Sequence, residues 1–328
     1  MARQTVAIAD HAFAPITLEP RMFAEVGADV RSGEDALTED AVVALAQDCD
    51  AILCDAAPIT RRVLEALPSV RVVSEYGIGV DNIDIAAATE LGVWVANVPG
   101  FCAEEVSDHT IATVLALGRR LVALDRIVRG GGWGAESAGK MHRLKTQTVG
   151  LIGLGAIGRL VAEKARALGM RVLAHSPNTD AARAAQHGAE AASLEEVLRN
   201  ADYVCLHTPT NAQTRGLIDA RTLGLMKPTA YLVNVGRGAL VDEPELVDAL
   251  RSARIAGAAL DVYASEPVDA ASPFLRLDNV LLSPHAAFYS EESLADLQIS
   301  AARNAIAVLR GGAPNTPVNP DVADRVRR

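Results

Sequence analysis

Aromatic residues, positive charge and long apolar runs are all scarce in this 328-residue chain, and each scarcity excludes a class of protein. Aromatic residues make up only 4% of the sequence, which leaves no stacking platform for nucleic-acid bases. Lys and Arg number 31 against 41 Asp and Glu, and the resulting net charge of −10 disfavours nucleic acid and anionic membranes. No apolar run reaches the roughly 18 residues of a membrane-spanning helix. We therefore expect neither nucleic-acid nor membrane partners.

Cysteine is also rare, and its spacing argues against a metal site. Cys49, Cys54, Cys102 and Cys205 form no CxxC pair and have no suitably spaced histidine, so we expect no metal. Scattered thiols without a disulfide framework are typical of a reducing compartment. The stretch Met1–Thr5 lacks the apolar segment of a signal peptide, so the expected location is cytoplasmic.

What is present indicates an α/β protein. Half of the residues are hydrophobic and 22% are charged, which is globular composition, and the length predicts two domains of about 100–200 residues each. Strand-like runs alternate with helical patterns, which predicts two doubly wound, Rossmann-like parallel sheets. The expected strands are 5–9, 51–53, 71–74, 94–96, 148–152, 171–174, 203–206, 230–234, 255–259 and 280–282. The expected helices are 39–47, 60–67, 85–91, 103–128, 156–168, 193–200, 219–225, 243–252 and 291–309.

One expected helix, 103–128, is unusually long. Val106, Thr110, Val114, Leu117 and Leu121 recur at spacings of three and four, which predicts one continuous helix that ends at the Gly130–Gly132 run. Adjacent residues on a helix point apart, so its Asp108 and His109 predict helix-face side chains and not a second acid/base pair.

A glycine-rich turn is the clearest local motif. Gly153, Gly155 and Gly158 follow the apolar strand 148–152 and open a helix, with Ala156 and Ile157 between them. The first glycine permits a tight turn, the second lets the backbone approach a pyrophosphate, and the third lets helix and strand pack closely. The turn therefore predicts a dinucleotide cofactor.

The residue that would bind the adenosine ribose is not acidic here. An Asp or Glu is expected about 20 positions after the turn, and Ser176 stands in its place. No Arg or Lys next to Ser176 is available to hold a 2′-phosphate, and an unpaired phosphate is costly. We expect NAD, without excluding NADP.

Three polar residues follow separate predicted strands: Arg237, Glu266 and His285. Ligands of parallel sheets bind beyond the carboxyl ends of the strands, so these side chains could converge there. A planar guanidinium binds carboxylate and carbonyl oxygens, and an imidazole titrates near neutrality and can move a proton. A carboxylate beside the imidazole would orient it and raise its pKa. This set suits hydride reduction of a 2-oxo acid.

With these segments, the chain resembles the D-isomer-specific 2-hydroxyacid dehydrogenases. The resemblance covers nearly the whole sequence and includes the run Tyr76–Asp84, the glycine turn and the Arg, Glu and His segments in family order. It implies that His285 is the acid/base and reaches the cofactor, that Glu266 is its partner, and that Arg237 anchors the substrate. It further implies that backbone amides around Ile78 and Gly79 hold the substrate carboxylate. The cofactor contacts it implies are Asp261 at the nicotinamide carboxamide, with Val235, Gly236, His207, Thr208 and Pro209 along the cofactor.

The resemblance also implies an architecture. A discontinuous, flavodoxin-like substrate domain, 1–102 plus 288–328, would flank a dinucleotide-binding domain, 103–287, with substrate in the cleft between them. A homodimer is implied, with the long helix crossing between subunits. Within the family, the segments near 101–106 and 285–292 are most similar to the C-terminal-binding-protein-like branch, in which Trp usually stands where this chain has Phe288.

The expected reaction is hydride transfer between NAD(P)H and a 2-oxo acid, and the resemblance implies the D-2-hydroxy acid as product. The residues do not identify which 2-oxo acid is used. Two alternatives stay open: an NADH-sensing, corepressor-like binding protein with little turnover, and a phosphite-type dehydrogenase on the same scaffold.

Overall fold

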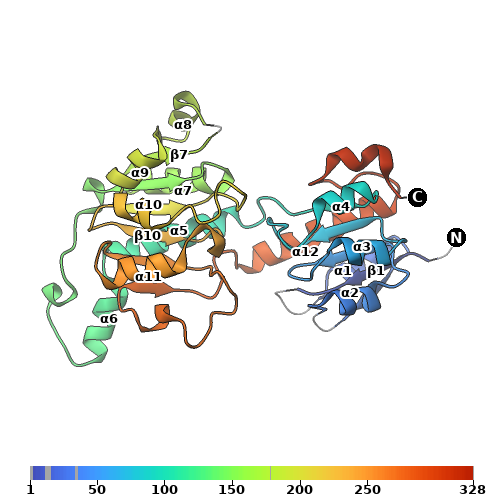
Figure 1. The fold of residues 1–328 in the computed structure, drawn as a ribbon, viewed down its shortest axis with the longest axis horizontal. Helices are drawn as coiled ribbons and strands as arrows, with labels where there is room; N and C mark the ends of the chain where they lie inside the picture. Colours follow the sequence, from blue (N-terminus) through green and yellow to red (C-terminus); the bar gives the residue numbers. More distant parts are fainter. Residues whose placement is uncertain (1–2, 12–15, 34–35, 178, 328) are drawn as a thin grey trace. The chain divides into compact units, whose positions relative to one another are not determined.

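The computed structural model describes residues 3–11, 16–33, 36–177 and 179–327. The chain divides into two units, the first made of residues 1–101 and 290–328 and the second of residues 102–289 (Figure 1). Each unit is a parallel sheet with helices on both faces, which confirms the fold class expected from the sequence.

The first unit has five parallel strands in the order β2-β1-β3-β4-β5. The strands are β1 Thr5–Ile8, β2 Asp29–Ser32, β3 Ala51–Cys54, β4 Val72–Glu75 and β5 Trp94–Ala96. Its helices are α1 Glu19–Glu25, α2 Glu39–Ala46, α3 Arg61–Ala66, α4 Ile85–Glu90 and α12 Glu291–Leu309. The last helix thus joins the first unit, as expected, although β2 and α1 were not foreseen.

Alternating side chains of these strands feed two separate cores. Val6 and Ile8 pack with α1 and α12, whereas Ala7 and Ile52 pack with α2, α3 and α4. Successive residues of a strand point to opposite faces, so a sheet buried on both sides needs apolar residues at almost every position. This explains why these strands appear in the sequence as short continuous apolar runs.

The segment after α12 closes the first unit. Its Val318 amide donates to the Val95 carbonyl at 2.8 Å, beyond the edge of the sheet. Further along, the guanidinium of Arg327 donates to the carbonyls of Leu64, Leu67, Val70 and Leu91 at 2.7–3.2 Å. The last carbonyls of a helix have no partner within the helix, so Arg327 satisfies groups at the carboxyl ends of α3 and α4.

The second unit has seven parallel strands in the order β12-β11-β10-β9-β6-β7-β8. They are β6 Thr148–Ile152, β7 Arg171–His175, β8 Glu190–Ala191, β9 Tyr203–Leu206, β10 Tyr231–Asn234, β11 Gly257–Leu260 and β12 Val280–Leu282. The helices are α5 Ala103–Gly118, α6 Leu121–Arg129, α7 Ala156–Ala167, α8 Ala181–Gln186, α9 Leu194–Asn200, α10 Ala220–Leu225 and α11 Glu243–Arg251. β8 and α8 were not foreseen.

The prediction of one helix over 103–128 is wrong. Arg120 adopts a left-handed conformation with φ 53°, which separates α5 from α6. Its guanidinium lies 5.6 Å from the ring centroid of Tyr231, which in turn stacks on Tyr203. This cation–π contact lies at the break between the two helices. No residue of α6 is buried, so the apolar spacing in its sequence does not correspond to a buried helix face.

Short polar residues begin many of these helices, as local sequence predicts. The N-cap side chains that accept a backbone N–H are Thr38, Thr60, Asp84, Asp180, Ser193, Asp219, Asp242 and Ser290. Among the described residues, we find no helix with the length and apolar character needed to cross a membrane.

The Arg327 contacts generate a stability prediction. Arg327→Ala should lower the free energy of unfolding of the first unit by about 2 kcal/mol, because buried carbonyls lose a charged donor. The measurement is urea unfolding followed by circular dichroism. Arg325→Ala is the matched control, since that side chain in the same segment is exposed. Equal unfolding midpoints for Arg327→Ala and the unsubstituted protein would contradict the capping role.

Candidate active site

Three neighbouring strands of the second unit deliver the three polar residues to one edge. Arg237 follows β10, Glu266 follows β11 and His285 follows β12, and these strands are adjacent and parallel. Their carboxyl ends therefore lie at the same edge of the sheet, where α/β folds bind ligands. The three loops are short enough to keep their side chains near that edge.

His285 and Glu266 form a direct pair. Nδ1 of His285 lies 2.6 Å from Oε2 of Glu266, while Oε1 of Glu266 accepts the Tyr263 amide at 2.9 Å. About 45% of the His285 side chain is exposed, so the pair is not sealed from solvent. The pairing was expected from residue types that follow predicted strands and from the family resemblance, and the structure shows the contact.

The pair shifts the acidity of both members. The hydrogen bond to Glu266 raises the pKa of His285 above its usual 6.5, although partial burial acts in the opposite direction. Burial pushes the pKa of Glu266 upward, but hydrogen bonds from His285 and the Tyr263 amide outweigh it, and that pKa falls below 4.5. The carboxylate therefore stabilises the protonated imidazolium, which can donate a proton.

Arg237 lies in a tight turn held by its neighbours. The buried Asn234 side chain accepts the Gly236 amide at 3.1 Å and donates to the Arg237 carbonyl at 2.9 Å. Any side chain at Gly238 would collide with the Tyr263 carbonyl, so this turn touches the loop that leads to Glu266. The positive charge of Arg237 lowers the pKa of His285, in opposition to the effect of Glu266. The charges of Arg237 and His285 therefore interact.

Asp261 holds the loop that carries His285, residues 283–287, through hydrogen bonds. Its buried carboxylate accepts hydrogen bonds from Ser283 Oγ at 2.6 Å and from the amides of Ala286 and Ala287 at 2.9 Å. Its carbonyl accepts the His285 amide at 2.8 Å. The nicotinamide contact expected of Asp261 stays a prediction. The structure adds that Asp261 fixes the conformation of the 283–287 loop.

Phe288 completes the surroundings of the histidine. Its ring meets the His285 ring edge to face, with centroids 6.1 Å apart and planes at 85°. An aromatic ring in this position gives the imidazole an apolar wall, as expected for a substrate-side residue.

The glycine turn has the shape that a pyrophosphate requires. Gly153 has φ 107°, and a side chain there would collide with the His207 carbonyl, while one at Gly158 would collide with the Gly153 carbonyl. A Cβ at Gly155 would meet nothing within 4 Å, and no side chain caps the start of α7. The positive end of α7 thus faces open space, which fits a dinucleotide phosphate. Ala156 and Ile157 form its first turn.

A second loop borders this turn and holds two buried polar atoms without a partner. Nε2 of His207 and Oγ1 of Thr210 are buried and accept or donate no hydrogen bond. Burial lowers the pKa of His207 to about 4, so the ring is neutral. Unsatisfied buried groups are rare and call for a ligand, which further supports the fit of a cofactor beside residues 207–210. Val235, at the end of β10, supplies a buried apolar wall.

Ser176 is the position expected at the adenosine ribose of the cofactor. Ser176 follows β7 and is partly exposed, with its carbonyl accepting the Thr179 amide at 3.1 Å. The neighbouring His175 turns its Nδ1 to the Ala192 carbonyl at 3.3 Å, so this histidine has a structural partner.

The expected carboxylate-binding loop belongs to the first unit. The run containing Ile78 and Gly79 follows β4 and is anchored by Asn97, whose Nδ2 donates to the Ile78 carbonyl at 2.7 Å. The Val98 amide donates to the Gly77 carbonyl at 2.8 Å. These two bonds hold the loop so that the amides of Ile78 and Gly79 have a defined direction.

In the first unit, a buried carboxylate holds the loop that follows β3. Its strand order places a potential binding crevice between β1 and β3. There the Asp10 carboxylate accepts the amides of Asp55, Ala56 and Ala57 at 2.6–3.1 Å. A carboxylate of the chain thus satisfies these three amides, whereas no side chain caps the amides at the start of α7 in the second unit.

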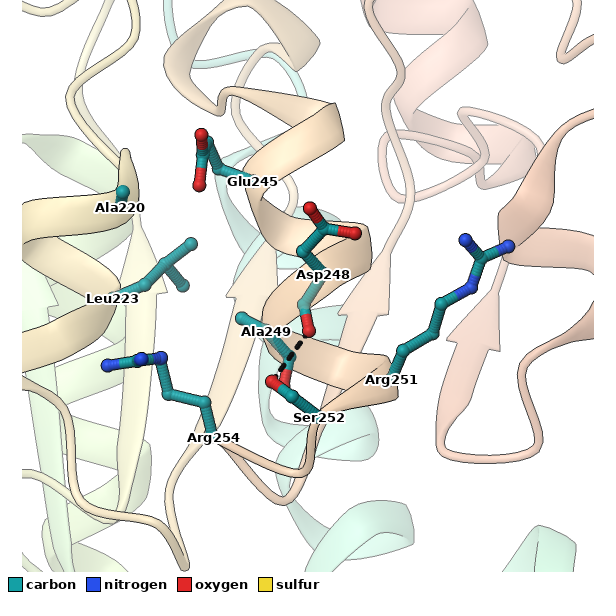
Figure 2. Close-up of a pocket in the computed structure, with 8 residues that line it drawn as sticks. All are labelled: Ala220, Leu223, Glu245, Asp248, Ala249, Arg251, Ser252 and Arg254. Atoms are coloured by element: carbon teal, nitrogen blue, oxygen red, sulfur yellow. Dashed lines mark hydrogen bonds between the residues drawn. The ribbon is translucent and has the colours of Figure 1, made fainter.

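A cavity of about 560 Å³ lies elsewhere, between α10 and α11 (Figure 2). Figure 2 shows side chains of both signs around it, and its lining residues are Ala220, Leu223, Glu245, Asp248, Ala249, Arg251, Ser252 and Arg254. Its walls come from helices, whereas the groups described above follow strands. In the described part of the chain, no three His, Cys, Asp or Glu side chains are grouped to hold a metal ion.

Two contributors escaped the sequence analysis. Thr210 lies just beyond the predicted 207–209 stretch, and its buried hydroxyl is visible only in the structure. The sequence predicted His109 as a helix-face side chain. In the structure its Nε2 lies 3.1 Å from Oγ of Ser283, in the loop that carries His285. No local pattern indicates the contact of His109, because Ser283 is 174 residues away in the sequence.

Comparisons with known proteins agree with this geometry. Residues 111–287 match the NAD binding domain of the D-isomer specific 2-hydroxyacid dehydrogenases. A glyoxylate reductase of Korarchaeum cryptofilum (strain OPF8) is 38% identical over 300 residues, which cover 90% of this chain and 90% of that protein.

Solved structures extend the likeness to cofactor complexes. An acyclic imino acid reductase in complex with NADPH and D-Arg is 26% identical with a TM-score of 0.87, over 96% of this chain and 100% of that one. The NAD-complexed D-isomer specific 2-hydroxyacid dehydrogenase of Lactobacillus delbrueckii ssp. bulgaricus is 26% identical with a TM-score of 0.76, over 96% and 100% of the chains. This chain therefore belongs to the D-isomer specific 2-hydroxyacid dehydrogenases and is an NAD(P)H-dependent oxidoreductase of 2-oxo and D-2-hydroxy acids.

Proposed function

We propose that His285, Glu266 and Arg237 carry the chemistry of this enzyme. The observation that supports the proposal most strongly is the 2.6 Å contact between His285 and Glu266 at the carboxyl edge of the sheet. His285 donates the proton to the substrate carbonyl oxygen and takes it back in the reverse reaction. Glu266 orients the ring and stabilises its protonated form, and Arg237 binds the carbonyl and carboxylate oxygens.

The cofactor, when bound, supplies or receives the hydride. Gly153, Gly155 and the first turn of α7 would hold its pyrophosphate. Ser176 would bind its ribose, and residues 207–209 with Val235 and Gly236 would line the rest of it. The amides of Ile78 and Gly79 bind the substrate carboxylate. We assign substrate binding to the first unit and dinucleotide binding to the second.

The substrate proposed is glyoxylate or another small 2-oxo acid. The name of the Korarchaeum relative supports this class. The aromatic ring of Phe288 beside His285 supports it too, because it encloses the reacting carbon with an apolar wall.

We further propose a cytoplasmic homodimer that uses α6 as its contact. Leu121, Val122, Val128 and Trp133 are all exposed, and Trp133 is 89% exposed, so α6 and the turn after it present an apolar surface. A second copy of the chain would cover it. The four buried cysteines form no disulfide, which supports a reducing compartment.

Turnover by a His285 variant tests the proposed chemistry. His285→Ala should lower kcat for glyoxylate reduction by at least about 10²-fold, because the carbonyl oxygen loses its proton donor. The assay is NADH and NADPH oxidation against 2-oxo acids from glyoxylate to phenylpyruvate, with Tyr289→Ala as a matched control next to the loop. Tight NADH binding without turnover on any 2-oxo acid would favour the sensing alternative.

A second prediction concerns pH. In the reduction direction His285 must be protonated, so kcat/KM is lost as pH rises through the His285 pKa, which Glu266 raises above 6.5. Glu266→Gln removes the negative charge, and the loss should move to lower pH. In the oxidation direction, where the neutral ring is needed, the same substitution should extend activity to lower pH. The pH profiles of both directions provide the measurement, and unchanged profiles would remove Glu266 from this role.

The third prediction concerns assembly. Leu121→Lys combined with Val128→Lys should convert the dimer to a monomer, because charges would replace the apolar contact. Sedimentation velocity measures the change. Leu37→Lys, at an exposed leucine of the first unit, is the control. A double variant that still sediments as a dimer would show that α6 is not the interface.

A further inference from the structure

Helix α5 carries a histidine that the chemistry above does not use. Nε2 of His109 lies 3.1 Å from Ser283 Oγ, and Ser283 Oγ donates to Asp261 Oδ1 at 2.6 Å. Because the hydroxyl proton is directed to Asp261, the contact with His109 requires Nε2 to be the donor. The three side chains therefore form one chain of hydrogen bonds with a defined direction, from α5 to the carboxyl end of β11.

The far end of this chain holds the backbone around His285. Asp261 accepts three amides in succession, those of His285, Ala286 and Ala287, at 2.8–2.9 Å. His285 itself has φ 51°, a left-handed conformation that is unfavourable for a residue with a side chain. Such a conformation persists only where surrounding contacts impose it, and Asp261 supplies those contacts.

Helix α5 is itself held in place next to His109. Nζ of Lys164, on α7, donates to Ser107 Oγ at 2.6 Å and to Asp108 Oδ1 at 2.7 Å. Since α7 begins at the glycine turn, α5 contacts both the helix that receives the cofactor phosphates and the loop that carries His285. His109 therefore projects from a fixed support.

We propose that His109 is a positioning residue which, through Ser283 and Asp261, holds the 283–287 loop so that His285 meets Glu266. The inference rests on the role proposed above for His285. His109 touches neither His285 nor Glu266, so it acts through the loop. The charged groups that face the His285 ring are Glu266, Asp261 and Arg237.

The test compares His109→Leu, His109→Gln and Ser283→Ala in glyoxylate reduction. His109→Leu should lower kcat by about 10- to 100-fold, the range expected when a reacting group is misplaced, with KM for glyoxylate within about twofold. The alkaline limb of the pH profile should move to lower pH, because a displaced imidazole loses its contact with Glu266. His109→Gln should restore most of kcat, because its amide can donate to Ser283.

A double-mutant cycle makes the link specific. If the two side chains act in series, His109→Leu with Ser283→Ala should be no slower than the slower single variant. His142→Leu, at an exposed histidine of the loop before β6, is the control and should match the unsubstituted enzyme.

Three results would overturn the positioning role. The first is an unchanged kcat and pH profile in His109→Leu. The second is an equal loss of kcat in the Leu and Gln variants together with lowered unfolding temperatures. The third is a double variant whose loss of kcat equals the product of the two single losses. His285→Ala in the same assay separates the two proposals. If it retains turnover, the proposed function fails, whereas if it alone loses turnover, only the role of His109 fails.

Discussion

The parallel pairing of β10, β11 and β12 is the constraint on which the active site depends. Asn234 aligns with Leu260, and Leu260 aligns with Leu282, so the three strands end at one level. Each strand then releases its loop on the same edge, which brings residues from three separate segments within reach of one another. A shift of one residue in any of these strands would turn its side chains to the other face and move its loop.

The two units share one architecture but differ in the loops that follow their strands. Both are parallel sheets covered by helices, and in both the strand order reverses at one point. In the first unit the Asp10 carboxylate accepts the amides of Asp55, Ala56 and Ala57. In the second, a Cβ at Gly155 would meet nothing within 4 Å, which leaves room for a dinucleotide phosphate at the start of α7. The match of residues 111–287 to an NAD binding domain agrees with this difference.

The sequence predicted most of the fold because its strands and helices are locally consistent. Apolar runs of four or five residues, short polar N-caps and the spaced glycines are signals that depend only on near neighbours. The prediction failed at Arg120, where the helix breaks beside the distant ring of Tyr231. It also missed α1, β2, β8 and α8. The strands β2 and β8 are mostly exposed, so they carry little apolar pattern.

The sequence by itself determined the chemistry that is available: a glycine turn for phosphates, a guanidinium for carboxylates, and an imidazole with a carboxylate. Only the tertiary structure decided which of these groups meet. His285 reaches Glu266 across 19 residues, and His109 reaches Ser283 across 174. Such contacts depend on strand register and on the left-handed backbone at His285, and neither is encoded in the residues next to them in the chain.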